Sequence, residues 1–145
     1  MNFELTLSNL QDRGCRITNT RREIVKIFSG MSSPLSANQI EEKLFNNGVN
    51  VNKATIYREL QFLLDNGYLI EVYLRPNEVS YESSKQKHHY YLVCEVCGKV
   101  DSVTDCLVKK LKNDVFKEKG FKIIRHTLKF YGTCVDCVRK SNHEK

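Results

Sequence analysis

Apolar residues in the first half of the chain recur at the spacing of amphipathic helices. The pattern predicts a short helix over residues 3–10 and a second helix through residues 24–31, capped by one of residues 18–20. A third helix is predicted to begin at Ser36, because Ser36 and Gln39 have the spacing of a capping box. These segments indicate a bundle of short helices at the start of the chain.

A fourth helix and a hairpin complete the N-terminal pattern. Asn52 is the predicted N-cap of this helix, and the Asn66-Gly67 pair is its predicted end. The aromatic and β-branched residues 68–74 and the stretch 79–82 predict two strands joined by a turn. Several helices followed by a hairpin form the outline of a winged helix-turn-helix.

The second half has a mixed pattern. Its apolar positions predict two short strands, at residues 90–94 and 99–103. A helix is predicted to follow, from Thr104 or Asp105 to Gly120, and then a long strand at residues 121–131. The even-numbered positions of the long strand, His126 among them, share one face. The polar tail from Val138 is expected to be frayed.

These patterns together predict an α+β protein with two domains. The first domain is expected over residues 1–82 and the second over residues 88–145. The polar stretch 83–87, which has no apolar residue, is the predicted linker.

Composition limits the function classes. The 145 residues are 41% hydrophobic and 28% charged, which is ordinary for a globular protein. No apolar run is long enough to span a membrane, and the N-terminus lacks the features of a secretory signal, so we expect the chain in the cytoplasm. The net charge of +6 favours an anionic partner. Basic residues cluster around the start of the second predicted helix: Arg13, Arg16, Arg21, Arg22 and Lys26.

Four of the six cysteines form two CxxC pairs, Cys94 with Cys97 and Cys134 with Cys137. In a reducing compartment such pairs indicate a metal site rather than disulfides. Four thiolates around one Zn²⁺ make a closed tetrahedral site, which stabilises structure and leaves no position for a reacting water. The alternative is a pair of redox-active dithiols, which the lack of a thioredoxin-like βαβ pattern disfavours.

The histidines raise the hypothesis of a second, exchangeable site for Fe²⁺, Mn²⁺ or Zn²⁺. His88 and His89 open the second domain, and His126 lies in its last predicted strand. Glu82 and Asp101 supply carboxylates within reach by sequence. A regular strand would point His88 and His89 to opposite faces. For His126, a hydrogen-bonded core histidine is the other interpretation.

The order of these motifs resembles that of the ferric uptake regulator (Fur) family of bacterial metal- and peroxide-responsive repressors. The resemblance extends over nearly the whole chain and is carried by the segments GCRITNTRREIV, ANQIEEKL, VNKATIYRELQFLLDNGYLIEV, HHYYLVCEVCGKV and HTLKFYGTCVDC. It implies an N-terminal winged-helix DNA-binding domain, a C-terminal α/β dimerisation domain and a homodimer. It also implies a structural zinc held by the two CxxC pairs.

Contacts to double-stranded DNA are predicted from the start of the fourth helix. A recognition helix presents its N-terminal side chains to the major groove, and these include Lys53, Thr55, Tyr57 and Arg58. Arg58 suits a base edge or a phosphate, and Tyr57 a thymine methyl or a phosphate. The resemblance adds Arg16, which matches a basic residue near the minor groove. The alternative is that this helix face is merely solvated.

Several residues depart from the family's exchangeable metal sites. Ser33, Tyr91 and Ser102 stand where the resemblance implies two histidines and a carboxylate. Both histidines of a second family site are present, but Tyr90 replaces its aspartate. Serine is a poor neutral ligand for Fe²⁺ or Mn²⁺, and tyrosine binds mainly as phenolate. The regulatory site is therefore expected to be either rebuilt or lost.

We therefore expect a transcriptional regulator, acting as a repressor, of metal homeostasis or the response to peroxide. It would bind an inverted-repeat operator as a homodimer. The alternative is a metal-independent DNA-binding dimer with structural zinc only, in which Cys15 or Cys106 serves as a redox handle, although a small buried hydrophobe is the simpler interpretation of both. A zinc enzyme is disfavoured because a closed site has no open metal position, and no small-molecule substrate is expected.

Overall fold

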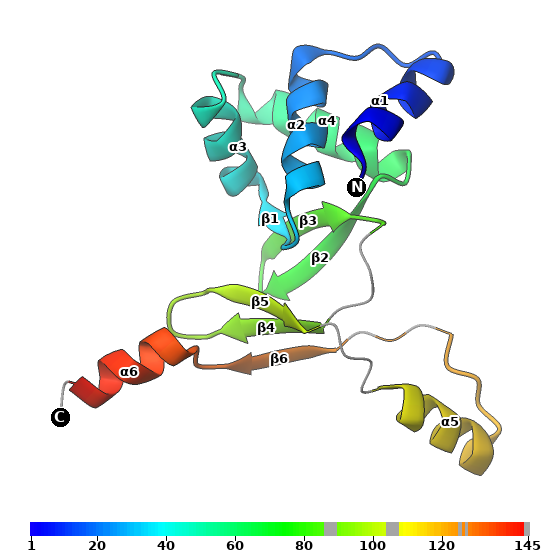
Figure 1. Ribbon diagram of the computed structural model, residues 1–145, viewed down its shortest axis with the longest axis vertical. Helices are drawn as coiled ribbons and strands as arrows, with labels where there is room; N and C mark the ends of the chain where they lie inside the picture. The colour runs from blue at the N-terminus through cyan, green and yellow to red at the C-terminus, as the bar shows by residue number, and fades with distance from the viewer. Residues whose placement is uncertain (86–89, 104–107, 125, 127, 144–145) are drawn as a thin grey trace. The chain divides into compact units, whose positions relative to one another are not determined.

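The computed structural model describes residues 1–85, 90–103, 108–124, 126 and 128–143. The chain divides into two compact units, residues 1–86 and residues 87–145. Each unit contains its own three-stranded sheet (Figure 1). None of the helices in the described ranges combines the length and apolar character that a membrane crossing requires.

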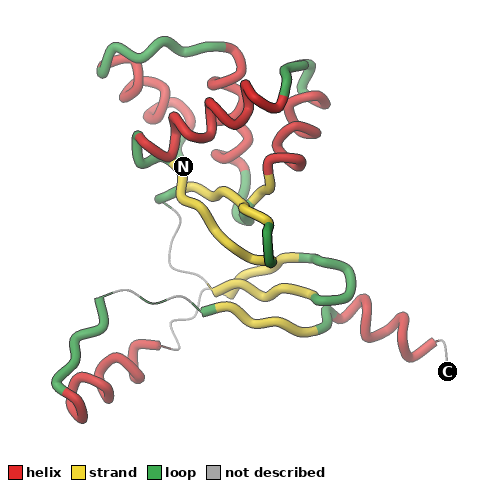
Figure 2. The backbone as a smooth tube through the Cα atoms, turned by 180° about the vertical axis from the view of Figure 1, so that it is seen from behind, coloured by secondary structure: helices red, strands yellow, loops and turns green. Residues whose placement is uncertain are grey.

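The first unit consists of four helices and a small sheet. The helices are α1 (Phe3–Asp12), α2 (Asn19–Gly30), α3 (Ala37–Asn46) and α4 (Lys53–Asp65). The strands are β1 (Leu35–Ser36), β2 (Leu69–Arg75) and β3 (Glu78–Ser83), in the antiparallel order β1-β3-β2. The four helices gather on one side of this sheet (Figure 2). The predicted helices and hairpin are confirmed, and the two-residue strand β1 was not predicted.

Side-chain caps define where these helices begin. The Thr18 hydroxyl accepts a hydrogen bond from the backbone N–H of Arg21 at the start of α2, at 3.1 Å. At the start of α3, Ser36 and Gln39 form the predicted reciprocal capping box. The caps satisfy backbone donors that have no partner inside the helix. The sequence therefore determines these helix starts locally.

An apolar core orients helix α4 within the first unit. Ile56, Leu60 and Leu63 of α4 are at most 1% exposed and belong to one cluster with side chains of α1, α2 and α3. Each such side chain contributes roughly 1.5–3 kcal/mol on burial. Because one face of α4 is held this firmly, the opposite face is presented to solvent in a fixed orientation.

The second unit contains the strands β4 (Tyr90–Cys94), β5 (Val100–Val103) and β6 (Lys129–Gly132) and the helices α5 (Val108–Lys119) and α6 (Val135–His143). The sheet order is β5-β4-β6, with β4 antiparallel to β5 and parallel to β6. The central strand β4 thus pairs both with β5, which follows it closely in the sequence, and with β6, which lies much later in the chain.

Two predictions for this half were wrong. Residues 121–124 do not form a strand, and the last strand is confined to Lys129–Gly132. The neighbouring strand β4 is five residues long and pairs with β6 from Tyr91 onward, and the described residues 121–124 lie outside that pairing. The tail is also not frayed from Val138, because α6 continues to His143. Its first turn is closed by the Cys134 carbonyl, which accepts from the Val138 N–H at 3.0 Å.

We predict that Asn52→Ala destabilises the first unit by about 1 kcal/mol in the free energy of unfolding. The Asn52 side chain accepts hydrogen bonds from the backbone N–H and the hydroxyl of Thr55, at 2.8 and 2.9 Å, and alanine removes both. Urea denaturation followed by circular dichroism measures the change. Asn50→Ala, in the exposed loop before α4, is the matched control. Equal stability of the two variants would contradict the assigned cap.

Candidate metal centre and nucleic-acid interface

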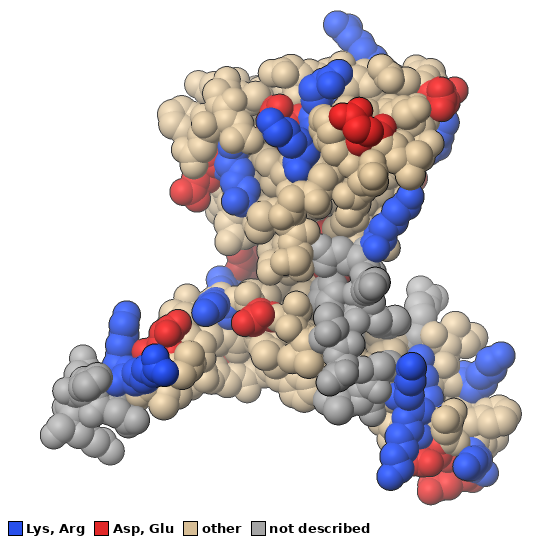
Figure 3. Space-filling model, in the orientation of Figure 1, with Lys and Arg blue, Asp and Glu red and all other residues tan. Residues whose placement is uncertain are grey.

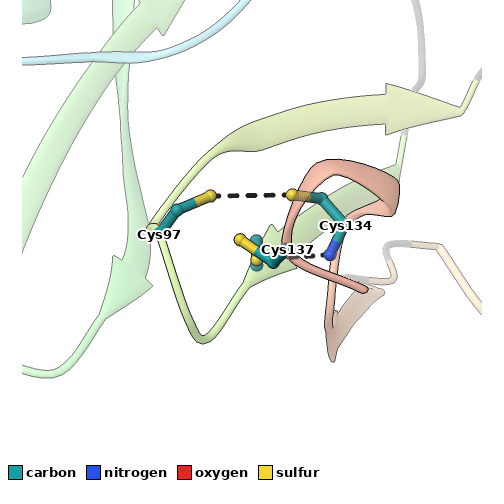
Figure 4. A group of neighbouring side chains, drawn as sticks. Cys97, Cys134 and Cys137 are labelled. Atoms are coloured by element: carbon teal, nitrogen blue, oxygen red, sulfur yellow. Dashed lines mark hydrogen bonds between the residues drawn. The ribbon is translucent and has the colours of Figure 1, made fainter. Parts of the chain in front are cut away.

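Four cysteine sulfur atoms meet in the second unit, where β4 and β6 end. Cys94 is the last residue of β4, Cys97 follows in the next turn, and Cys134 and Cys137 lie at the start of α6. Their Sγ atoms all lie within 4.8 Å of one another. Cys97 and Cys134 point toward each other with a Sγ–Sγ distance of 3.6 Å (Figure 4). The structure thus brings together the two CxxC pairs.

Backbone hydrogen bonds explain why the two pairs meet. Residue Gly98 has a φ of 74°, which allows the tight turn after Cys97, and its N–H donates to the Cys94 carbonyl at 2.9 Å. Parallel pairing then places Cys94 opposite Gly132, two residues before Cys134. The N–H of Glu95 donates to the Gly132 carbonyl at 2.8 Å and extends this pairing. The strand register therefore fixes the distance between the two cysteine pairs.

The cluster fits a zinc ion. Tetrahedral coordination with Zn–S bonds of about 2.3 Å places the sulfur atoms about 3.8 Å apart, which agrees with the observed spacing. The backbone N–H of Cys134 also donates to the Cys94 sulfur at 3.2 Å, as expected for a sulfur that carries negative charge. Four thiolate ligands suit a soft ion such as Zn²⁺ rather than Mg²⁺ or Ca²⁺. They would complete its coordination without an open position.

The thiols of the cluster differ in acidity. Backbone N–H groups, that of Cys97 first and that of Cys134 next, lower the pKa of Cys94 to about 6. Hydrogen bonds with the neighbouring sulfur atoms of Cys134 and Cys97 raise the pKa of Cys137 to about 12. The difference between the pKa values of Cys94 and Cys137 reflects how close the sulfur atoms lie, because neighbouring thiolates repel one another. A bound divalent cation would relieve that repulsion.

The residues proposed for an exchangeable metal are distributed over both units. Glu82 lies in β3 of the first unit and is 6% exposed. Asp101 lies in β5 of the second unit, where its Oδ1 accepts from the backbone N–H of Ser102 at 2.8 Å. His88 and His89 lie outside the described residues. The exchangeable site therefore stays a prediction.

His126 and the positions that depart from the family pattern have defined surroundings in the second unit. His126 Nε2 lies 3.1 Å from the hydroxyl of Tyr90, the residue that the sequence resemblance matches to an aspartate. Tyr91 and Ser102, which replace expected ligands, face each other as partners across β4 and β5, and Tyr91 is buried. The tyrosine hydroxyl thus gives His126 a polar partner that is not a carboxylate.

The predicted DNA contacts occupy the exposed face of α4 and its first turn. Tyr57 is 51% exposed. The guanidinium of Arg58 donates to the Thr55 hydroxyl at 3.3 Å, and Thr55 in turn is bound by the helix cap. Lys53 donates to the Asn38 side chain at 3.2 Å and forms an exposed ion pair with Glu41 at 3.7 Å. These side chains form a polar surface with one aromatic ring.

The basic cluster near α2 is only partly a surface feature. Arg16 is exposed, whereas the Arg21 side chain is 12% exposed and bonds to Glu59 of α4 with an Nε–Oε2 distance of 2.7 Å. Arg21 therefore cannot be counted among the surface cations. Sequence reasoning missed the burial of Glu59, although its position three residues after the apolar Ile56 places it on the core-facing side. On the face seen in Figure 3, basic side chains of this unit alternate with acidic ones.

Comparisons with known proteins give matches over most of the chain. A model of the Ferric uptake regulator family matches residues 12–131. The Ferric uptake regulation protein of Neisseria meningitidis is 32% identical over 135 residues, which cover 92% of this chain and 94% of that protein. The Zinc uptake regulation protein of Mycobacterium tuberculosis is 31% identical over 124 residues, covering 86% and 95%. The solved structure of the Helicobacter pylori ferric uptake regulator Fur has the same fold, with a TM-score of 0.81, 23% identity and 95% coverage of both chains.

We predict that the purified protein holds about one zinc per chain and that Cys97→Ser loses it, because serine offers a neutral hydroxyl in place of a thiolate. Loss of zinc should unfold the second unit and dissociate the dimer. Metal analysis after dialysis, thermal unfolding and light scattering measure these changes.

Cys15→Ser is the matched control, because Cys15 is a half-buried free cysteine that packs against the core of the first unit. This variant should keep the zinc. A Cys97→Ser protein that is zinc-free, folded and dimeric would refute the structural role of the cluster.

Proposed function

Because the chain belongs to the Ferric uptake regulator family, we propose that it is a transcriptional repressor of metal homeostasis or of the response to peroxide. It binds an inverted-repeat operator as a homodimer. In this proposal residues 1–82 form the DNA-binding domain, residues 83–87 the linker and residues 88–145 the dimerisation domain. The observation that carries the proposal is the exposed, polar N-terminal face of α4, which the core of the first unit holds in place.

The chemistry of this face suits the major groove of DNA. Arg58 supplies a planar fork of donors that can bind a guanine edge or a phosphate. Tyr57 adds an exposed ring that can pack on a thymine methyl. Lys53 and Thr55 at the start of the helix can bind phosphates, and so position the helix. The hairpin β2–β3 is the wing that accompanies such a helix.

The apolar surface of the second unit supports the homodimer. The buried apolar residues that the structure describes there are few: Tyr90, Tyr91, Val93, Cys94 and Val108. Many large apolar side chains are instead exposed in this chain, including Leu92, Leu111, Phe116, Phe121, Ile124, Phe130, Tyr131 and Val135. So many exposed apolar side chains in one small unit indicate an association surface rather than a solvated one. A second copy of the chain is the proposed partner, and a two-fold dimer matches an inverted repeat.

Two metal sites are proposed for the repressor. The first is a structural zinc held by Cys94, Cys97, Cys134 and Cys137. The second is an exchangeable site for Fe²⁺, Mn²⁺ or Zn²⁺, formed from Glu82, His88, His89, Asp101 and His126. The H. pylori relative, whose structure reveals three functional metal binding sites, is a precedent for more than one site.

A metal-independent repressor is the second candidate function. The cross-strand pair of Tyr91 and Ser102 favours it, because both positions lack the nitrogen or carboxylate ligand of the family pattern. The Tyr90 hydroxyl beside His126 also stands where that pattern has an aspartate. In this alternative the zinc at the four cysteines only stabilises the fold. The dependence of DNA affinity on added metal distinguishes the two candidates.

We predict that Arg58→Ala lowers the affinity for the operator by roughly 1–3 kcal/mol, because the guanidinium binds a base edge or a phosphate. The operator is the duplex that the parent protein selects from a random-sequence pool. Fluorescence anisotropy at fixed salt measures the affinity, since phosphate contacts make it salt-dependent.

Arg139→Ala is the matched control, because it removes the same charge from an exposed position in α6 of the second unit. This variant should bind like the parent. Equal binding by Arg58→Ala and the parent would remove Arg58 from the interface, and a parent protein that selects no duplex would contradict the proposed function.

A further inference from the structure

A buried charge lies on the core-facing side of the recognition helix. The buried residues of α4 are Ile56, Glu59, Leu60 and Leu63, and Glu59 is the charged member of this set. It directly follows Arg58, the main proposed DNA contact. A carboxylate on such a face is unfavourable unless it is paired and hydrogen-bonded. Its partners therefore reveal what this position does.

Glu59 connects α4 to the start of α2. Its Oε2 accepts from Arg21 Nε at 2.7 Å, and its Oε1 accepts from the Thr18 hydroxyl at 3.4 Å. Thr18 is also the N-cap of α2. The two side chains of the ion pair are each 12% exposed, so solvent weakens their attraction less than it does at the surface.

Arg21 extends this connection to the loop before α2. Its Nη1 donates to the backbone carbonyl of Arg16 at 2.6 Å. Its guanidinium carbon also lies 3.6 Å from the centre of the Phe62 ring, on α4. One planar group thus contacts Glu59, Phe62 and the loop at the same time, which a lysine ammonium cannot do.

The network therefore joins two proposed DNA contacts that lie far apart in the sequence. Arg58 is adjacent to Glu59 on α4. Arg21, which is paired with Glu59, donates to the backbone carbonyl of Arg16. We propose that Arg21 and Glu59 are positioning residues, which fix the Arg16 loop against the recognition helix so that Arg16 and Arg58 reach one DNA duplex together. This inference rests on the proposed function, because it assigns a role to the same interface.

A fixed loop matters because a flexible one must be ordered when DNA binds. Ordering the backbone of even a single residue has an entropic cost, and a preformed interface avoids that cost on binding. Arg16 itself is exposed, so its side chain stays available while its backbone is held. Arg21 contributes to affinity without touching DNA.

A double-mutant cycle separates positioning from general stability. Arg21→Lys keeps a cation beside Glu59 but removes the second donor that binds the Arg16 carbonyl. Its effect on operator affinity is measured twice, in the parent and in Arg16→Ala, by anisotropy at fixed salt. We expect a loss of roughly threefold to thirtyfold in the parent and less than about twofold in Arg16→Ala, because the role of Arg21 passes through Arg16.

Arg22→Lys is the matched control, since Arg22 is the adjacent exposed arginine of α2, and it should bind like the parent. If Arg21→Lys does not fold, as judged by circular dichroism, Glu59→Gln takes its place in the same cycle.

Three outcomes would overturn this inference alone. If Arg21→Lys lowers operator affinity equally in the parent and in Arg16→Ala, Arg21 acts through general stability and not through Arg16. Parent-like binding by Arg21→Lys or by Arg16→Ala shows that the loop position does not matter. In each of these cases Arg58→Ala still tests the proposed function separately. A parent protein that binds no duplex overturns both.

Discussion

The second unit depends on the meeting of two cysteine pairs that are distant in the sequence. The sheet alone offers little, since β4 and β6 are five and four residues long and the unit buries few apolar side chains in the described ranges. A zinc ion held by the four thiolates would close the chain from the end of β4 to the start of α6, and metal binding of this kind contributes directly to folding. The parallel register of β4 and β6 holds the sulfurs at the spacing that the ion requires.

The first unit achieves its order differently. Its four helices share one apolar core, and several begin at side-chain caps that the local sequence supplies. Burial of one side of α4 fixes the direction of Tyr57 and Arg58 on the other. The ion pair of Arg21 and Glu59 then adds one specific link between α4 and the loop that carries Arg16. Apolar packing orients the helix, and the polar network sets its register with the loop.

Local signals made much of this structure predictable from the sequence. Some features depend only on residues close to one another, and the local sequence predicts them. These are the helix caps at Ser36 and Asn52 and the hairpin after Gly67. The prediction of a long strand over residues 121–131 was wrong because alternating apolar residues do not show whether a partner strand is present. The helix α6 was missed because its start depends on the turn through Cys134 and Cys137. The pairing of Arg21 with Glu59 joins distant positions, and no local pattern in one sequence reveals it.

The proposed function makes the affinity of this repressor for DNA dependent on metal. The most direct test starts from protein that carries one zinc per chain and from a labelled operator duplex at fixed salt. Fe²⁺ without oxygen, Mn²⁺ or additional Zn²⁺ is titrated in, and anisotropy reports binding. We expect that at least one of these ions tightens binding, and that the same ion has no effect on a variant lacking His89. Strong binding that no added ion changes would exclude this metal dependence and leave the metal-independent repressor.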